Sequence, residues 1–271
     1  MKKKLLSIVA VLAVGLCYYF DLPIEEILHS VGQVPEKSYT VTEGIETPKT
    51  SEKELILSKM NYTVSFNEKM NIPNWVAWSI SKEELIERES RTNKFEPDPS
   101  LPEHLAVTTE DYTNSGYDRG HMCPAADNKY HWRAMDECFY MTNICPQNHN
   151  LNAGVWSSLE NQCREWAEEG HTVYIACGPI INAKTKARYI GSEHKVRVPD
   201  GFFKVVIYGL ESGNPQAAGF VFENKAVGKK SLGNYACTID EVEKITGFDF
   251  FYRLEDEVEE RLESKVMTLS N

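Results

Sequence analysis

The sequence lacks an excess of basic residues, closely spaced cysteine pairs and an apolar run of full membrane-spanning length. Lysine and arginine number 29 against 40 aspartates and glutamates, which gives a formal net charge of −11. This balance argues against a protein that coats nucleic acid, because such proteins usually carry a basic stripe. No two cysteines have the C-x-x-C spacing of a zinc ribbon. A single cleft could still attract phosphate locally.

The N-terminus carries a short apolar segment behind three lysines. Residues 5–20 form an apolar run of 16 residues, shorter than the roughly 20 that a spanning helix needs. No small-x-small cleavage site follows, and Leu16 precedes Cys17 where lipid attachment would require a small residue. A cleaved signal peptide, an uncleaved membrane anchor and a lipoprotein all stay open. In each case we expect export to the periplasm or the cell exterior.

The rest of the chain is long and apolar enough to fold. With 271 residues, 42% hydrophobic and 11% aromatic, it can bury a sizeable core as one domain or two small ones. Residues 21–60 are polar and proline-containing, and we interpret them as a tether with a short helix at 24–31. Residues 61–254 are the expected folded domain, and 255–271 an acidic, solvated helical tail. Six cysteines follow Cys17, and after export they could form disulfides or stay buried as free thiols.

Hydrophobic periodicity predicts both strands and helices along the folded part. Alternating, β-branched and aromatic stretches predict strands at 62–66, 74–80, 139–144, 172–177, 202–208 and 217–223. Caps and amphipathic spacing predict helices at 81–89, 131–138, 152–170 and 239–251. We therefore expect an α+β fold in which helices flank a mixed or antiparallel central sheet.

The chemically informative stretch runs from Gly116 to Arg164. It contains Asp118-Arg119-Gly120-His121 and then Asn152 and Glu160. Hydrolysis of a phosphodiester needs an activated water, neutralisation of the transition-state charge and stabilisation of the departing oxygen. A neutral histidine suits the first task. A hard cation held by few protein ligands, such as Mg²⁺ on an asparagine oxygen, suits the other two.

Helix geometry favours a pairing of Asn152 with Glu160. Eight residues at 100° place the two side chains within about 80° of each other and about 12 Å apart along the axis. Because side chains tilt toward the helix N-terminus, Glu160 leans back toward Asn152. Each residue also has a plainer explanation. Asn152 could be an N-cap, His121 a structural hydrogen-bonding group, and Asp118-Arg119 a surface ion pair.

Taken together, these residues resemble one family, the DNA/RNA non-specific endonucleases of the ββα-metal class, which has secreted bacterial and mitochondrial members. Asp118-Arg119-Gly120-His121 matches the signature tetrapeptide. The resemblance extends over about Tyr62 to Leu254. The downstream matches are Asn143-Ile144, Pro146-Gln147, Asn152, Trp156, Leu159-Glu160, Arg164, Cys177-Gly178-Pro179, Phe202-Phe203-Lys204 and 246–251.

The resemblance implies a role for each matched position. His121 would be the general base, and Asn152 the direct ligand of one Mg²⁺, or of Mn²⁺ in its place. Glu160 would hold the metal through water, and Arg119 and Arg91 would bind the phosphate.

Further positions would support the site. Asp118 would orient the motif, and Asn143 and Gln147 would support it without doing chemistry. Cys123 stands where the family usually has a small residue, which leaves redox sensitivity open. The implied partners are DNA and RNA, bound through the phosphate backbone, and the sequence leaves a homodimer open.

Two other interpretations compete with this one. A catalytically silent nucleic-acid-binding relative would lack the base or the ligand, and here both His121 and Asn152 are present. A structural metal module would use His121, Cys123, Cys138 and Cys145, whose spacings do not resemble known zinc knuckles.

Overall fold

The computed structural model describes residues 39, 41–51, 53–226, 231–267 and 269. The predicted helix at 24–31 and the apolar segment at 5–20 lie outside these residues. Within the described part of the chain, no helix has the length and apolar character needed to cross a membrane.

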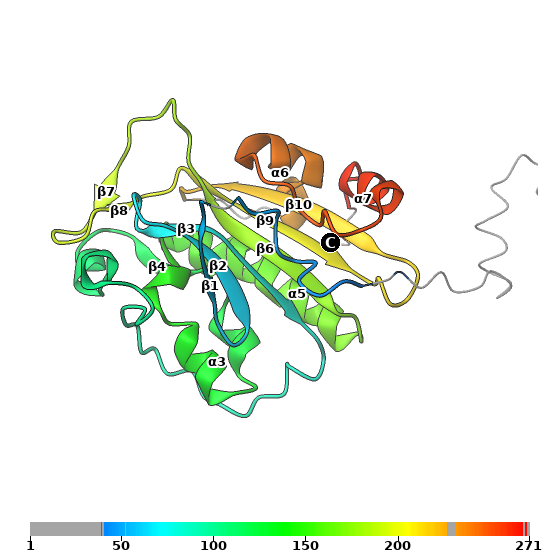
Figure 1. The fold of residues 1–271 in the computed structure, drawn as a ribbon, viewed down its shortest axis with the longest axis horizontal. Coiled ribbons are helices and arrows are strands. Elements are labelled where there is room, and N and C mark those ends of the chain that lie inside the picture. Colours follow the sequence, from blue (N-terminus) through cyan, green and yellow to red (C-terminus); the bar gives the residue numbers. More distant parts are fainter. Residues whose placement is uncertain (1–38, 40, 52, 227–230, 268, 270–271) are drawn as a thin grey trace, which may run out of the picture.

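A seven-stranded antiparallel sheet forms the centre of the molecule (Figure 1). Its strands follow the order β1-β2-β3-β6-β9-β10-β11. Their bounds are β1 Leu55–Ser58, β2 Tyr62–Asn67, β3 Ile72–Ile80, β6 Val173–Ile180, β9 Gly201–Tyr208, β10 Gln216–Glu223 and β11 Ala236–Cys237.

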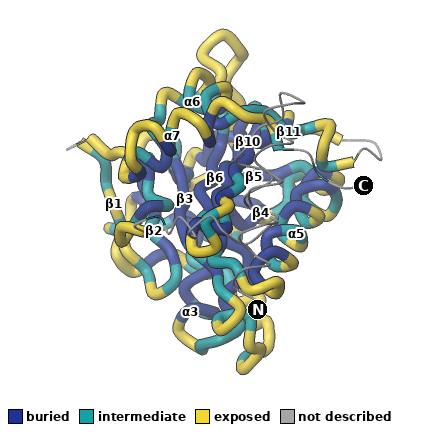
Figure 2. The backbone as a smooth tube through the Cα atoms, turned by 90° about the vertical axis from the view of Figure 1, so that its right-hand side faces the viewer, coloured by how far each residue is buried: buried dark blue, intermediate teal, exposed yellow. Residues whose placement is uncertain are grey.

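The central strands are buried on both faces because helices cover both sides of the sheet. Side chains alternate along a strand, so in β3 Val76 and Trp78 join one core while Trp75 and Ala77 join the other. The first core also receives α3 (Trp132–Glu137) and α5 (Ser157–Glu168). The second receives α6 (Ile239–Thr246) and α7 (Asp256–Glu263), which lie together in the upper part of Figure 1. Figure 2 shows the dark, buried strands between these layers.

A small ββα unit sits against the first core. Strand β4 (Asp118–His121) pairs antiparallel with β5 (Ile144–Gln147). The chain then enters α4 (His149–Leu151), a π-helical turn over Asn152–Trp156, and α5. Strands β7 (Tyr189–Ile190) and β8 (Val196–Arg197) form a separate small ribbon. The predicted α+β class with an antiparallel central sheet is confirmed.

Several predicted elements are present and two are wrong. The strands expected at 62–66, 74–80, 172–177, 202–208 and 217–223 and the helix at 131–138 are present within a few residues. Residues 81–89 form turns instead of a helix, because the backbone N–H groups of Arg88 and Glu89 donate to the Lys129 carbonyl.

The second wrong element is the strand expected at 139–144. It is instead a 3-10 turn over Met141–Asn143, and strand structure begins only at Ile144.

The alternative explanation of Asn152 as an N-cap is excluded. The helical segment begins earlier, at α4, where the Asn148 side chain caps it by accepting a 3.1 Å hydrogen bond from the Asn150 backbone N–H. Asn152 itself has helical dihedral angles, φ −57° and ψ −56°. The π-helical turn also changes the angular count between Asn152 and Glu160, because more residues are needed per turn there than in an α-helix.

The folded body extends beyond residues 61–254 at both ends. Strand β1 lies inside the predicted tether and pairs with β2, and Ile45 is fully buried in the second core. Helix α7 lies inside the predicted acidic tail and is helical as expected. It is not simply solvated, because Val258 and Leu262 pack into that same core.

Candidate active site

Backbone pairing between β4 and β5 fixes the position of the signature tetrapeptide. His121 pairs with Ile144, and Gly120 with Cys145. A Cβ atom at residue 120 would lie 2.2 Å from the Gln147 Oε1 atom. Only glycine at residue 120 therefore leaves room for the fully buried Gln147 side chain, which fills the space beside it.

His121 lies in an aromatic pocket. Its ring centroid is 4.9 Å from that of Phe139 in an edge-on arrangement and 5.2 Å from that of Phe95. The residue is 8% exposed, and its Nε2 atom has no hydrogen-bond partner among the described residues. An unpartnered buried ring nitrogen is costly, so this atom is available to a group that enters the site.

The pKa of His121 is lowered to about 3, first by burial and then by the positive charges of Arg91 and Arg119. The imidazole is therefore neutral at any pH near 7 and able to accept a proton. The two arginines are exposed and stack on the same aromatic rings, Arg119 4.3 Å from the Phe95 centroid and Arg91 5.3 Å from that of Phe139. The structure thus brings both predicted phosphate-binding arginines close to the predicted base.

Asp118 orients the Asn152 side chain. The Asn152 Nδ2 group donates a 2.9 Å hydrogen bond to Asp118 Oδ2, which also lies 2.9 Å from His149 Nδ1. A carboxylate only accepts hydrogen bonds, so the amide nitrogen must face it and the Oδ1 oxygen must face elsewhere. The carbonyl oxygen is thus kept for another partner, as a metal ligand requires.

The π-helical turn carries Asn152 on a local break in the helix. Gly154 has φ −105° and ψ −117°, outside the helical range. Such π-helical turns occur frequently at functional sites.

A groove of about 340 Å³ runs past these groups. Its lining includes Asp118, Arg119 and Asn152 together with Phe95, the ring that contacts His121. Arg91, His121 and Glu160 are not part of the lining. Of the predicted residues, Arg119 and Asn152 therefore line the groove, and His121 lies against the Phe95 ring.

Glu160 is not among the residues that line the groove, and it belongs to a partly buried charged cluster. Lys204, Asp127 and Arg164 are the charged groups that act on it most strongly. Burial is the main cause that raises the pKa of Glu160 to about 7, against the lowering effect of Lys204 and Arg164. Arg164 Nη1 bonds Asp127 Oδ1 at 2.7 Å, and Trp78 Nε1 donates to the other Asp127 oxygen at 3.0 Å.

The sequence analysis assigned no role in the site to Lys204 or Asp127, two members of this cluster. Lys204 is fully buried, and its Nζ atom lies 4.3 Å from the centroid of the Trp156 ring and has no hydrogen-bond partner among the described residues. One signal was available in the sequence: a single lysine in the otherwise unbroken apolar stretch of β9. Asp127 had no comparable signal.

The expected supporting residues Asn143 and Gln147 are both fully buried. Asn143 Oδ1 accepts from the Cys123 backbone N–H at 2.9 Å, and Asn143 Nδ2 donates to the carbonyls of Cys123 and Cys138 at 2.8 Å. Burial raises the pKa of the Cys123 thiol well above its usual range, which disfavours the reactive thiolate. All six described cysteines are free.

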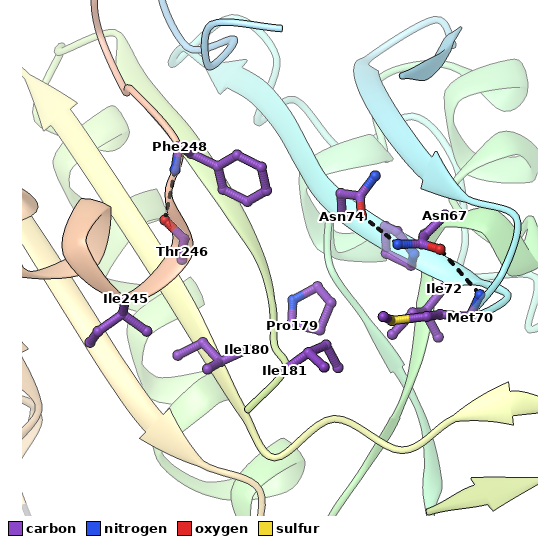
Figure 3. A pocket seen from close by; sticks show the side chains of 11 residues that line it. Asn67, Met70, Ile72, Asn74, Pro179, Ile180, Ile181, Ile245, Thr246 and Phe248 are labelled. Atoms are coloured by element: carbon purple, nitrogen blue, oxygen red, sulfur yellow. Dashed lines mark hydrogen bonds between the residues drawn. The ribbon is translucent and has the colours of Figure 1, made fainter. Parts of the chain in front are cut away.

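A second cavity, of about 170 Å³, lies away from this site (Figure 3). It opens between the β2–β3 hairpin, the end of β6 and the end of α6. None of its lining side chains ionises, and none is a predicted site residue. Its lining is Asn67, Met70, Ile72, Pro73, Asn74, Pro179, Ile180, Ile181, Ile245, Thr246 and Phe248.

The four side chains of the zinc alternative do not meet. Among the described residues, the histidines, cysteines and acids that come close enough to share an ion are Asp240, Glu243 and Glu263. His121 and the three cysteines are not in that group. This finding removes the basis of the structural zinc module.

The match to a family model decides the relationship. The model for the DNA/RNA non-specific endonucleases matches residues 42–257. The chain belongs to this family. The span begins before the predicted boundary at residue 61, in agreement with the ordered β1 strand.

Curated relatives and a solved structure are consistent with that membership. The chain is 39% identical over 207 residues to "Nuclease EXOG, mitochondrial" of Mus musculus, covering 72% of this chain but only 56% of that protein. It is 32% identical to "Nuclease" of a Nostoc species, covering 82% of each chain. The crystal structure titled "Crystal structure of the EndoG/EndoGI complex: Mechanism of EndoG inhibition" matches with a TM-score of 0.68 at 25% identity, covering 74% of this chain and 86% of the other.

Proposed function

We propose that the protein is a Mg²⁺-dependent non-specific endonuclease that hydrolyses phosphodiester bonds of DNA and RNA. Membership of the endonuclease family and relatives with nuclease names support the reaction class. The observation that carries the proposal is the neutral, unpartnered His121 beside two exposed arginines, in contact with Phe95, which lines the same groove as Asn152.

His121 acts as the general base. Its low pKa keeps the imidazole in the accepting form, and the free Nε2 takes the proton from the attacking water. Arg119 and Arg91 bind the non-bridging phosphate oxygens and stabilise the added charge of the transition state. Their charges also oppose protonation of the base before the reaction begins.

The residues present fit a Mg²⁺ ion held sparsely. Asn152 offers its Oδ1 because Asp118 holds the amide nitrogen, and Glu160 would hold the ion through water. Bound Mg²⁺, or Mn²⁺ in its place, neutralises phosphate charge and stabilises the departing alkoxide. A neutral amide oxygen and water are ligands that hard cations accept.

Binding through phosphates explains broad substrate choice. Arg91 and Arg119 contact the backbone, which DNA and RNA share, and neither reads a base edge. Cutting should therefore show little sequence dependence and fall as salt rises. A strong recognition sequence would contradict this part of the proposal.

Plasmid digestion tests the function directly. The purified protein should nick and degrade plasmid and RNA with Mg²⁺ and lose activity in EDTA, and Mg²⁺ alone should restore it. The His121→Ala variant should be folded and inactive. Binding without cleavage by the wild-type protein with Mg²⁺ would instead support a catalytically silent relative.

We further propose that the protein is exported, with residues 5–20 as its signal or anchor. The basic N-terminus followed by an apolar run supports this. Cell fractionation tests it: activity should appear in the periplasm, the medium or the membrane fraction. Recovery of full-length protein from the cytoplasm alone would contradict it. Gel filtration of the same preparation would establish whether the protein is a homodimer.

A further inference from the structure

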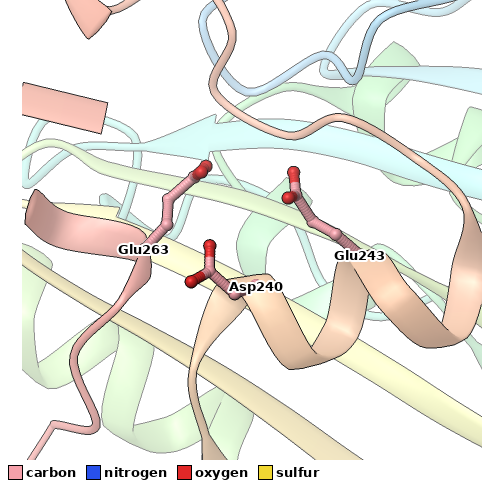
Figure 4. A group of neighbouring side chains, drawn as sticks. All are labelled: Asp240, Glu243 and Glu263. Atoms are coloured by element: carbon pink, nitrogen blue, oxygen red, sulfur yellow. The ribbon is translucent and has the colours of Figure 1, made fainter. Parts of the chain in front are cut away.

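Three carboxylates meet on the side of the sheet that the active site does not use. Asp240 and Glu243 lie one turn apart on α6, and Glu263 is the last residue of α7. One carboxylate oxygen from each lies within 4.8 Å of the others. Figure 4 shows the three side chains from the two helices facing a common gap.

One member of this group is buried without a partner. Glu263 is 5% exposed, and its Oε1 atom has no hydrogen-bond partner among the described residues. A buried carboxylate oxygen with no partner is costly. Its position inside the carboxylate group therefore indicates a missing positive ligand, and this observation is separate from the mere clustering of acids.

The strongest electrostatic influences on Glu263 come from other acids. The charged groups that act on it most strongly are Glu243, Glu259, Asp240 and Asp249. Burial and these neighbours raise the pKa of Glu263 to about 9. The nearby Lys49 pairs with Asp249 at 3.2 Å. A cation bound between the three carboxylates would offset this concentration of negative charge.

The number of carboxylates favours a large hard cation. Ca²⁺ takes six to eight oxygen ligands in flexible geometry, whereas Mg²⁺ demands near-ideal octahedral geometry and is usually bound by only one or two carboxylates. Three carboxylate oxygens that lie within 4.8 Å of one another are close enough to share one Ca²⁺ ion. Glu243 is also held in place, because its Oε1 accepts a 2.8 Å hydrogen bond from the Phe250 backbone N–H.

We propose that Asp240, Glu243 and Glu263 bind one Ca²⁺ ion that joins α7 to α6. The site is distinct from the groove and takes no part in hydrolysis. Its effect is to hold the C-terminal helix against the second core, where Val258 and Leu262 are already packed.

Calorimetry and thermal unfolding of the full chain test the proposal. The catalytic metal site is removed first by Asn152→Ala, so that any remaining Ca²⁺ binding belongs elsewhere. Titration with CaCl₂ at pH 7.5 should show one site. Ca²⁺ at about a hundredfold its Kd should raise Tm by roughly 5–10 °C.

Matched variants on the same background identify the ligands. Asp240→Asn and Glu263→Gln should each abolish the Ca²⁺-dependent rise in Tm, while Glu257→Gln, an exposed glutamate on the same helix, should keep it. The absence of a Ca²⁺-dependent rise in the Asn152→Ala protein would overturn the proposal. Retention of the full rise in Glu263→Gln would overturn it equally, because Ca²⁺ would then bind elsewhere. Unfolding in EDTA shows whether each variant is folded.

Discussion

The two faces of the central sheet both carry buried charge, but they balance it differently. On the face beneath α5, Lys204 and Arg164 lie among Glu160 and Asp127, so both signs are present. On the face beneath α6 and α7, Asp240, Glu243 and Glu263 are all acidic. The first cluster combines positive and negative side chains of the chain itself. The second needs a proton or an ion from solution.

This difference shows that buried charge can either hold a side chain in place or make a packing contact depend on solution conditions. A mixed cluster can hold Glu160 in one position at any cation concentration, which suits a residue that must be ready for substrate. A cluster of one sign makes the attachment of a helix depend on conditions. The predictions below test whether the two faces are independent in this way.

The largest expected effect is on the active-site face. His121→Ala should lower kcat by about a thousandfold or more, since the general base is lost. Plasmid nicking with Mg²⁺ measures this, and an unchanged Tm would show that the fold is intact. His104→Ala, at an exposed position, is the control and should behave as wild type. Near-normal activity in His121→Ala would show that another group takes the proton.

The pH profile at low Mg²⁺ should report Glu160. Its pKa is raised to about 7, so it is protonated below that pH and cannot hold the cation. Activity should fall by about tenfold per pH unit below 7. Added Mg²⁺ should shift this acidic limb of the pH–activity profile to lower pH. His121, with a pKa of about 3, contributes nothing to the limb. Glu160→Gln should be slower and lack the limb, so a limb that persists in this variant would assign it to another group.

Removal of the buried Lys204 charge should destabilise the cluster that it forms with Glu160, Asp127 and Arg164. In Lys204→Met, the two carboxylates lose the lysine and keep Arg164 as a strongly acting basic neighbour. Breaking a buried ion cluster in this way costs roughly 3 kcal/mol of unfolding free energy, which urea denaturation measures. The double variant with Glu160→Gln should recover part of the loss. Lys186→Met, at an exposed site, is the control, and a Lys204→Met protein as stable as wild type would show that the cluster does not need the cation.

The smallest expected effect is on the thermal stability of the metal-free protein, through Glu263 on the face that carries the three carboxylates. The pKa of Glu263 is raised to about 9 from an ordinary value of 4.5, so its protonated form stabilises the fold. That contribution is complete below pH 4.5 and is lost as pH rises through 9. In EDTA, Glu263→Gln should therefore raise Tm by a few degrees at pH 9 but little at pH 5. An equal change at both values would contradict the assigned shift.

The sequence predicted the sheet and the site motif because both depend on local pattern. Apolar alternation identified the central strands, and the order of Asp118, His121 and Asn152 carried the family resemblance. The errors came where tertiary contacts override local preference. Ser81 and Glu84 predicted the start of a helix at 81–89, and their capping contact is present, with Glu84 Oε2 2.9 Å from the Ser81 backbone nitrogen. The helix does not form, because the backbone N–H groups of Arg88 and Glu89 donate to the Lys129 carbonyl.

Burial and charge balance could not be predicted from one chain alone. The proximity of Lys204 to Glu160 and Asp127 depends on β9 lying opposite α5, and no spacing in the sequence specifies that arrangement. Likewise, Phe95 stands in a proline-rich loop, and nothing in that loop indicates that its ring meets both Arg119 and His121. The roles of the individual site residues stay predictions.

The contact between Gly120 and Gln147 has a consequence for how this sequence can change. The absent side chain of one residue is the space that the other fills, with only 2.2 Å from an added Cβ to Gln147 Oε1. Neither position is free to drift alone: a methyl group at 120 requires a shorter neighbour at 147. In a library of random variants, survivors altered at Gly120 should carry a second, compensating change at Gln147.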